Sequence, residues 1–154
     1  MTAPEGRLDW GPLGDSLGFL LRLAQLEAFE AYFAAMEGAA PLPGSLSILL
    51  MVRGNPGIRQ GVLARALRIK RAHMTKIVQS LEQAGLLRGS VPADDRRAIE
   101  LHLTPAGLAE AERAWSAVLA HETAPPATLT AEEAAQLRHL LRRYLSLQEH
   151  GHEP

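Results

Sequence analysis

The sequence contains no cysteine, and this absence excludes several kinds of site. A disulfide scaffold, a cysteine-ligated zinc site, a thiol nucleophile and a thiol redox switch all require that residue. Aromatic residues make up only 5% of the chain, and no apolar run approaches the length of about 18 residues that a membrane helix needs. The first residues also lack the pattern of a signal peptide. We therefore expect a cytoplasmic protein without a membrane segment.

The motifs of common catalytic sites are missing as well. The sequence has no phosphate-binding loop, glycine-rich dinucleotide turn, G-x-S-x-G elbow or metal-hydrolase helix. One pair of adjacent carboxylates, Asp94 and Asp95, falls in a predicted exposed turn rather than in a cleft. The six histidines show no spacing that would bring together the roughly three or four ligands of a metal site. We expect neither an enzyme nor a resident metal or cofactor.

Charge is divided unevenly along a chain of 154 residues whose formal net charge is −1. Residues 53–103 hold ten basic and four acidic residues, a balance of +6. The remainder holds six basic and thirteen acidic residues, a balance of −7. A basic segment within a nearly neutral chain suits a polyanion such as nucleic acid. An ordinary solvated surface would give the same numbers, so charge alone leaves DNA binding open.

A long helix is predicted from Asp15 or Ser16 to about Met36. Its apolar residues occur on nearly every face, whereas a helix on the surface of a small domain normally has one apolar face. We therefore expect a partner subunit to cover this helix.

The rest of the chain alternates helices with one β-hairpin. Hydrophobic periodicity and turn signals predict short helices over residues 45–52, 59–66 and 70–84, strands over 86–91 and 98–103, and helices that begin at Thr104 and Thr130. Thr104 is the expected N-cap of its helix, and Thr130 forms a capping box with Glu133. This order predicts a mainly α (α+β) fold, a winged helix-turn-helix with flanking helices.

The helix over 70–84 has one apolar stripe, formed by Met74, Ile77, Val78 and Leu81, and Gly85 is placed to end it. Its opposite face is small, polar and basic. In a winged helix-turn-helix, this helix enters the major groove, about 12 Å wide, and its N-terminal side chains reach base edges. Residues further along are better placed for phosphates. We expect major-groove contacts from Lys70, Arg71, Ala72, His73, Thr75 and Lys76, and phosphate contacts from Gln79, Ser80 and Arg59.

The tip of the hairpin places Arg96 and Arg97 beside Asp94 and Asp95. A carboxylate can hold a guanidinium extended, which lowers the side-chain entropy lost when the arginine enters a minor groove. The alternative is a self-neutralising surface turn.

Several blocks of the sequence, in order, resemble the MarR family of bacterial transcriptional regulators. The resemblance covers about residues 42–107 by motif, and the flanking helices match by position only. Its most specific part is the pattern at the hairpin tip, or wing: Asp95-Arg96-Arg97, followed by a strand that ends in Leu103-Thr104 and by the helix glycine Gly107. The blocks are Asn55–Ile58, Leu63–Leu67, Leu81–Leu86, Asp95–Ala98 and Leu101–Gly107.

The resemblance implies a homodimer that presents two winged modules to a pseudo-palindromic operator in double-stranded DNA. Residues 1–40 would form an N-terminal arm and dimerisation helix, 41–103 the DNA-binding module, and 104–154 the C-terminal dimerisation helices. It also implies a repressor released by a small, often aromatic and anionic ligand. By position, Asp95 is the wing carboxylate, Arg97 is its partner, and one or both of Arg96 and Arg97 are the minor-groove probe.

One feature departs from that pattern, and two questions stay open. Relatives begin the recognition helix with a Ser or Asp cap and small hydroxyl residues, whereas this chain has Lys70, Ala72 and His73, so no base preference is carried over. The alternative function is a dimeric winged-helix adaptor that binds protein rather than DNA. Candidate ligand contacts, with plain core packing as the alternative, are Met51, Arg113 and Trp115.

Overall fold

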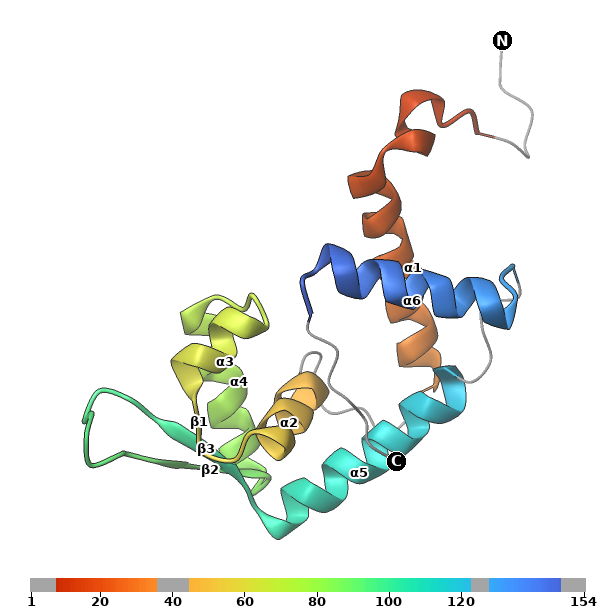
Figure 1. The fold of residues 1–154 in the computed structure, drawn as a ribbon. Helices are drawn as coiled ribbons and strands as arrows, with labels where there is room; N and C mark the ends of the chain where they lie inside the picture. The colour runs from red at the N-terminus through yellow and green to blue at the C-terminus, as the bar shows by residue number, and fades with distance from the viewer. Residues whose placement is uncertain (1–7, 36–44, 123–127, 148–154) are drawn as a thin grey trace. The chain divides into compact units, whose positions relative to one another are not determined.

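The computed structural model describes residues 8–35, 45–122 and 128–147 of the chain (Figure 1). The chain divides into two compact units, Met1–Ala117 and Val118–Pro154. Within the described ranges, no helix has both the length and the apolar character needed to cross a membrane. The elements are η1 (Gly11–Asp15), α1 (Leu17–Ala35), α2 (Ser45–Gly54), β1 (Ile58–Arg59), α3 (Gln60–Ala66), α4 (Arg71–Gln83), β2 (Leu87–Ser90), β3 (Glu100–Leu103), α5 (Pro105–Glu122) and α6 (Ala131–Tyr144).

The sheet has three antiparallel strands in the order β1-β3-β2, which corrects the predicted two-stranded hairpin. The additional strand is β1, where Ile58 pairs with Leu101 and Arg59 pairs with Glu100. Two residues are too few to show the period of a strand, and they follow a turn directly. As a result, the helix predicted to begin at Arg59 begins one residue later, at Gln60.

The core of the winged module lies between α2, α3, α4, the sheet and the first turns of α5. All four residues of the predicted α4 stripe are buried there, which confirms the helical period. Because this stripe is buried, the opposite face of α4 is fixed outward. The buried cluster consists of Ile48, Leu49, Val52, Leu63, Ala64, Met74, Ile77, Val78, Leu81, Leu87, Leu101 and Ala111.

The predicted glycine end of α4 is also confirmed. Gly85 has φ +71°, its N–H donates to the carbonyl of Glu82, and the N–H of Leu86 donates to the carbonyl of Leu81. These two bonds form a Schellman motif, which satisfies carbonyls at the helix end. The motif turns the chain directly from α4 into β2.

The joint between β3 and α5 is closely packed. Thr104 caps α5 as predicted, because its hydroxyl accepts the N–H of Gly107 at 3.0 Å. The same hydroxyl donates to the backbone carbonyl of Gly85 at 2.6 Å. The backbone N–H of Thr104 donates to the carbonyl of Leu86 at 3.1 Å. Gly107 is buried so close to Leu86 that a Cβ there would overlap the Leu86 carbonyl.

The turn between α3 and α4 places Arg68, with φ +54°, in the left-handed region that favours glycine. We expect Arg68→Gly to stabilise the protein by about 0.5–1 kcal/mol, because relief of backbone strain outweighs the greater entropy of the unfolded chain. Chemical denaturation measures this change. The matched control, Arg65→Gly inside α3, should destabilise by about 1 kcal/mol. Equal destabilisation by the two variants would contradict the assignment of strain to Arg68.

Candidate nucleic-acid interface

The outward face of α4 carries the predicted reading residues. Lys70 stands at its N-cap and makes no side-chain capping bond, as expected from the missing Ser or Asp. Ser80, a predicted phosphate contact, is half-buried. The remaining predicted residues of this face, all exposed, are Lys70, Arg71, Ala72, His73, Thr75, Lys76 and Gln79.

The hydroxyl of Thr75 is already engaged within the protein. It donates to the backbone carbonyl of Arg71 at 3.0 Å and accepts the side-chain amide of Gln60 at 3.1 Å. With its hydroxyl satisfied on both sides, Thr75 has its methyl group left for an apolar contact such as a thymine methyl.

The wing carboxylates are arranged differently from the prediction. Asp95 accepts the backbone N–H of Arg97 at 3.0 Å, and its ion pair in the described structure is with Arg59, at 3.9 Å, rather than with the Arg97 guanidinium. Asp94 pairs with the same Arg59 at 2.6 Å. The pairing of Asp95 with the Arg97 guanidinium is therefore wrong. An aspartate binds a backbone N–H two residues later readily, and that bond shapes the turn rather than extending a side chain.

Arg96 and Arg97 are exposed at the wing. Neither guanidinium has an ion pair within 4.0 Å among the residues that the structure describes. Both charges therefore face solvent and are available to an anion.

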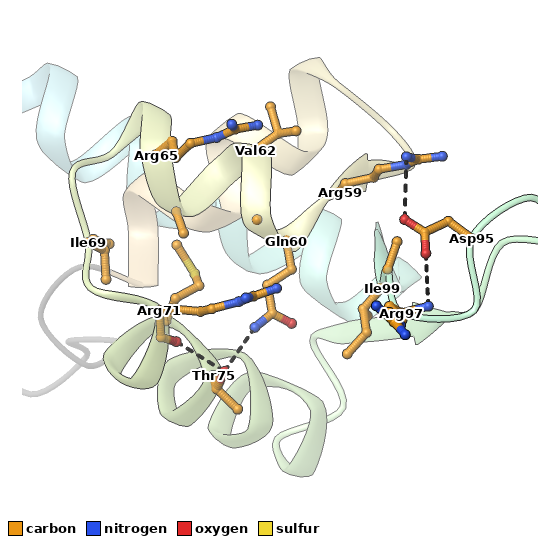
Figure 2. A pocket seen from close by; sticks show the side chains of 14 residues that line it. Arg59, Gln60, Val62, Arg65, Ile69, Arg71, Thr75, Asp95, Arg97 and Ile99 are labelled. Carbon is orange, nitrogen blue, oxygen red and sulfur yellow. Dashed lines mark hydrogen bonds and ion pairs between the residues drawn. The ribbon is translucent and has the colours of Figure 1, made fainter.

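A hollow of about 670 Å³ separates α4 from the wing. Figure 2 shows Arg71, Thr75 and Gln60 on one side of it and Arg97 with Ile99 on the other. Four arginines and one carboxylate line it, so the formal charge of its lining is positive. The full lining is Arg59, Gln60, Gly61, Val62, Ala64, Arg65, Ile69, Arg71, Met74, Thr75, Asp95, Arg97, Ala98 and Ile99.

Both helices that border this hollow have a basic residue at the N-cap position. Arg59 is the N-cap of α3 and Lys70 that of α4, and neither side chain makes a capping bond. A helix N-terminus carries a partial positive charge and is stabilised by acidic or hydroxyl residues, so cations there are locally unfavourable. An external polyanion compensates such an arrangement.

The candidate ligand contacts lie away from the hollow. Arg113 is bound by both carboxylate oxygens of Glu110, at 2.6 and 3.0 Å, and this hydrogen-bonded pairing raises the pKa of its guanidinium. Met51 and Trp115 are half-buried, and Met51 packs against the core. None of the three lines the hollow, and their contact with a ligand stays a prediction.

Sequence reasoning missed three residues of this surface: Gln60, Arg65 and, as a partner of Arg59, Asp94. Arg65 could have been predicted, because it belongs to the basic segment 53–103 and lies in the helix that precedes α4. Gln60 and Asp94 act through contacts between distant segments, for which the sequence holds no local signal. In the described ranges, no group of three or more His, Asp or Glu residues is placed to hold a metal ion.

Comparison with known proteins gives concordant results. The sequence profile of the MarR family matches residues 42–98. A protein of Thauera aromatica assigned as a transcriptional regulatory protein for the hcr operon is 34% identical over 136 residues, covering 86% of this chain and 81% of its own.

Solved structures agree in fold. The transcriptional repressor CouR bound to a 23-mer DNA duplex is 32% identical, with a TM-score of 0.76 over 92% of this chain and 97% of its own. CouR bound to p-coumaroyl-CoA gives 28% identity and a TM-score of 0.79 over 92% of this chain and 100% of its own.

Proposed function

Because the chain belongs to the MarR family of transcriptional regulators, we propose that it is a sequence-specific repressor that binds double-stranded DNA. The observation that carries this proposal is one basic surface on which the outward face of α4 and the wing flank a positively charged hollow. The DNA-bound structure of CouR supports it. The family comprises regulators rather than enzymes, and we propose no catalytic activity.

The two elements have different roles in this proposal. The first turns of α4 read base edges in the major groove, with Arg71 as the side chain suited to a bidentate contact with guanine. Gln79 and Ser80 contact phosphates, which position the protein without reading sequence. Arg96 and Arg97 enter the minor groove from the wing. The remaining major-groove contacts are Lys70, Ala72, His73, Thr75 and Lys76.

We propose that the repressor is a homodimer. Leu17, Leu20 and Leu26 of α1 are about half exposed, at 57%, 46% and 46%. In α6, Leu137 and Leu140 are 46% and 48% exposed. So much exposed apolar surface on two helices favours burial against a second copy. Residues 1–40 and 104–154 then serve dimerisation, and residues 41–103 bind DNA.

Sedimentation at micromolar concentration is expected to show a species of about 33 kDa, twice the chain mass of 16.7 kDa. Leu20→Asp should shift it toward the monomer, because a carboxylate at the subunit interface is costly to desolvate. The control Glu27→Gln, also exposed on α1, should leave the dimer intact. A wild-type chain that sediments as a monomer throughout this range would refute the dimer.

The proposal includes release from DNA by a small aromatic ligand, supported by the structure of CouR with p-coumaroyl-CoA. Met51, Arg113 and Trp115 stay candidate contacts for it. As a regulator of transcription, the protein would act in the cytoplasm.

Selection of genomic fragments tests the function. Purified protein is mixed with sheared DNA from the genome that encodes it, and bound fragments are sequenced. The proposal predicts enrichment of a pseudo-palindromic site, tighter binding to it than to a scrambled duplex, and release by an aromatic acid or its CoA thioester. Retention of no fragment above background would favour the alternative, an adaptor that binds protein.

A further inference from the structure

Arg59 links two segments that are 35 residues apart in the sequence. Its backbone belongs to β1 and pairs with Glu100 of β3, the strand that leads out of the wing. Its guanidinium reaches the wing tip, with Nη2 2.6 Å from Oδ2 of Asp94 and Nη1 3.9 Å from Oδ2 of Asp95. One residue therefore contacts both the base and the tip of the wing.

The next residue, Gln60, makes the connection to α4. Its backbone N–H donates to the carbonyl of Ile99 at 2.8 Å, and its side chain donates to Thr75 at 3.1 Å. Thr75 in turn donates to the backbone carbonyl of Arg71. Figure 2 shows both ends of this link around the hollow: the ion pair of Arg59 with Asp95, and the bonds from Gln60 to Thr75 and from Thr75 to Arg71.

The identity of Arg59 is not explained by the stability of α3. At an N-cap, Ser, Thr, Asp or Asn would satisfy a helix N–H and stabilise the helix, whereas Arg59 makes no such bond. Its side chain is used instead across the module, on the two wing carboxylates.

We propose that Arg59 is a positioning residue that fixes the wing at a set spacing from α4 before DNA arrives. This inference rests on the proposed function, and it replaces the predicted phosphate contact of Arg59. A wing held in place loses less conformational entropy on binding, so its arginines enter the minor groove at lower cost. Gln60 completes the link by tying the same point of the chain to α4.

The direction in which one substitution changes DNA affinity distinguishes this role from simple electrostatic attraction. Asp94→Asn removes a negative charge near DNA, so electrostatic attraction alone predicts tighter binding. The positioning role predicts weaker binding, by about twofold to fivefold for each wing, because the pair is solvent-exposed. Fluorescence anisotropy on the selected operator measures the change. Unchanged or tighter binding by Asp94→Asn would overturn the proposal.

Two further readouts separate positioning from a phosphate contact. Arg59→Gln should weaken binding by a similar factor without changing the dependence on salt, whereas loss of one phosphate contact in each subunit would reduce the magnitude of that slope by about two. The charge-reversed pair, Arg59→Glu with Asp94→Arg, has the wild-type net charge and should recover affinity relative to either single variant. A reduced slope or failed recovery would count against the link.

Wing motion in the free protein tests the inference independently of DNA. Backbone ¹⁵N relaxation should show lower order parameters at residues 94–97 in Arg59→Gln than in the wild type. If the wild type binds no DNA, the proposed function fails, while this measurement still decides whether Arg59 restrains the wing. Unchanged order parameters would overturn that restraint.

Discussion

Gly107→Ala is expected to lower the melting temperature by about 6–12 °C, the largest effect on stability that the structure predicts. A Cβ at this position would overlap the backbone carbonyl of Leu86, which cannot rotate away as a side chain would. The first turn of α5 would have to move, and the bonds of Thr104 to Gly85 and Leu86 would lengthen. Such overpacking costs about 3 kcal/mol where backbone must shift.

Gly61→Ala is the matched control for this substitution. Gly61 also lies in a helix, but an added Cβ meets no atom within 4 Å. Alanine there should stabilise α3 by up to about 1 kcal/mol. Thermal unfolding followed by circular dichroism compares the two variants. A melting temperature of Gly107→Ala within the error of the wild type would show that the joint between β3 and α5 adapts easily.

Arg71→Ala is expected to remove discrimination at one base pair in each half-site, by about 1–3 kcal/mol per site. Arg71 begins α4, is exposed, and lines the hollow opposite the wing. From the end of the helix, a guanidinium reaches two acceptors of guanine at once, and alanine offers no replacement. The measurement is a set of binding curves for wild type and variant on operators substituted singly at every position.

The matched control for Arg71 is Gln79→Ala, on the same exposed face. As a phosphate contact, Gln79 should contribute similarly to every sequence, so its loss should weaken all operators by one common factor. If Arg71→Ala also weakened all operators uniformly, Arg71 would be a phosphate contact and base reading would belong to other residues of α4.

Features set by local sequence were predicted correctly. The apolar stripe of α4, the glycine after it and the Thr104 cap each depend on residues within one or two helical turns. The capping box of α6 was predicted in the same way, and Thr130 and Glu133 exchange both of its bonds. Short-range hydrogen bonding and helical period decide these features, so sequence carries them.

Features set by distant segments were missed or wrong. The strand β1 exists because Ile58 and Arg59 pair with β3, more than 40 residues later in the chain. The partner of Asp95 was expected to be the nearby Arg97, yet the fold brings Arg59 to both wing carboxylates. The backbone N–H of Arg97 binds Oδ1 of Asp95, while Oδ2 of the same carboxylate faces Arg59, and only the folded chain brings that arginine near. Sequence therefore predicted the reading surface but not the link that spans it.

The salt dependence of operator binding tests the central claim most directly. If α4 and the wing of both subunits bind duplex DNA, the logarithm of the binding constant must fall linearly with the logarithm of salt concentration. The slope is about −0.9 per neutralised phosphate, or roughly −5 to −9 for the 6–10 phosphates that such proteins commonly contact. Anisotropy titrations over 50–200 mM salt, a range about fourfold wide, determine this slope. A slope near zero, or no binding at the lowest salt, would contradict the account.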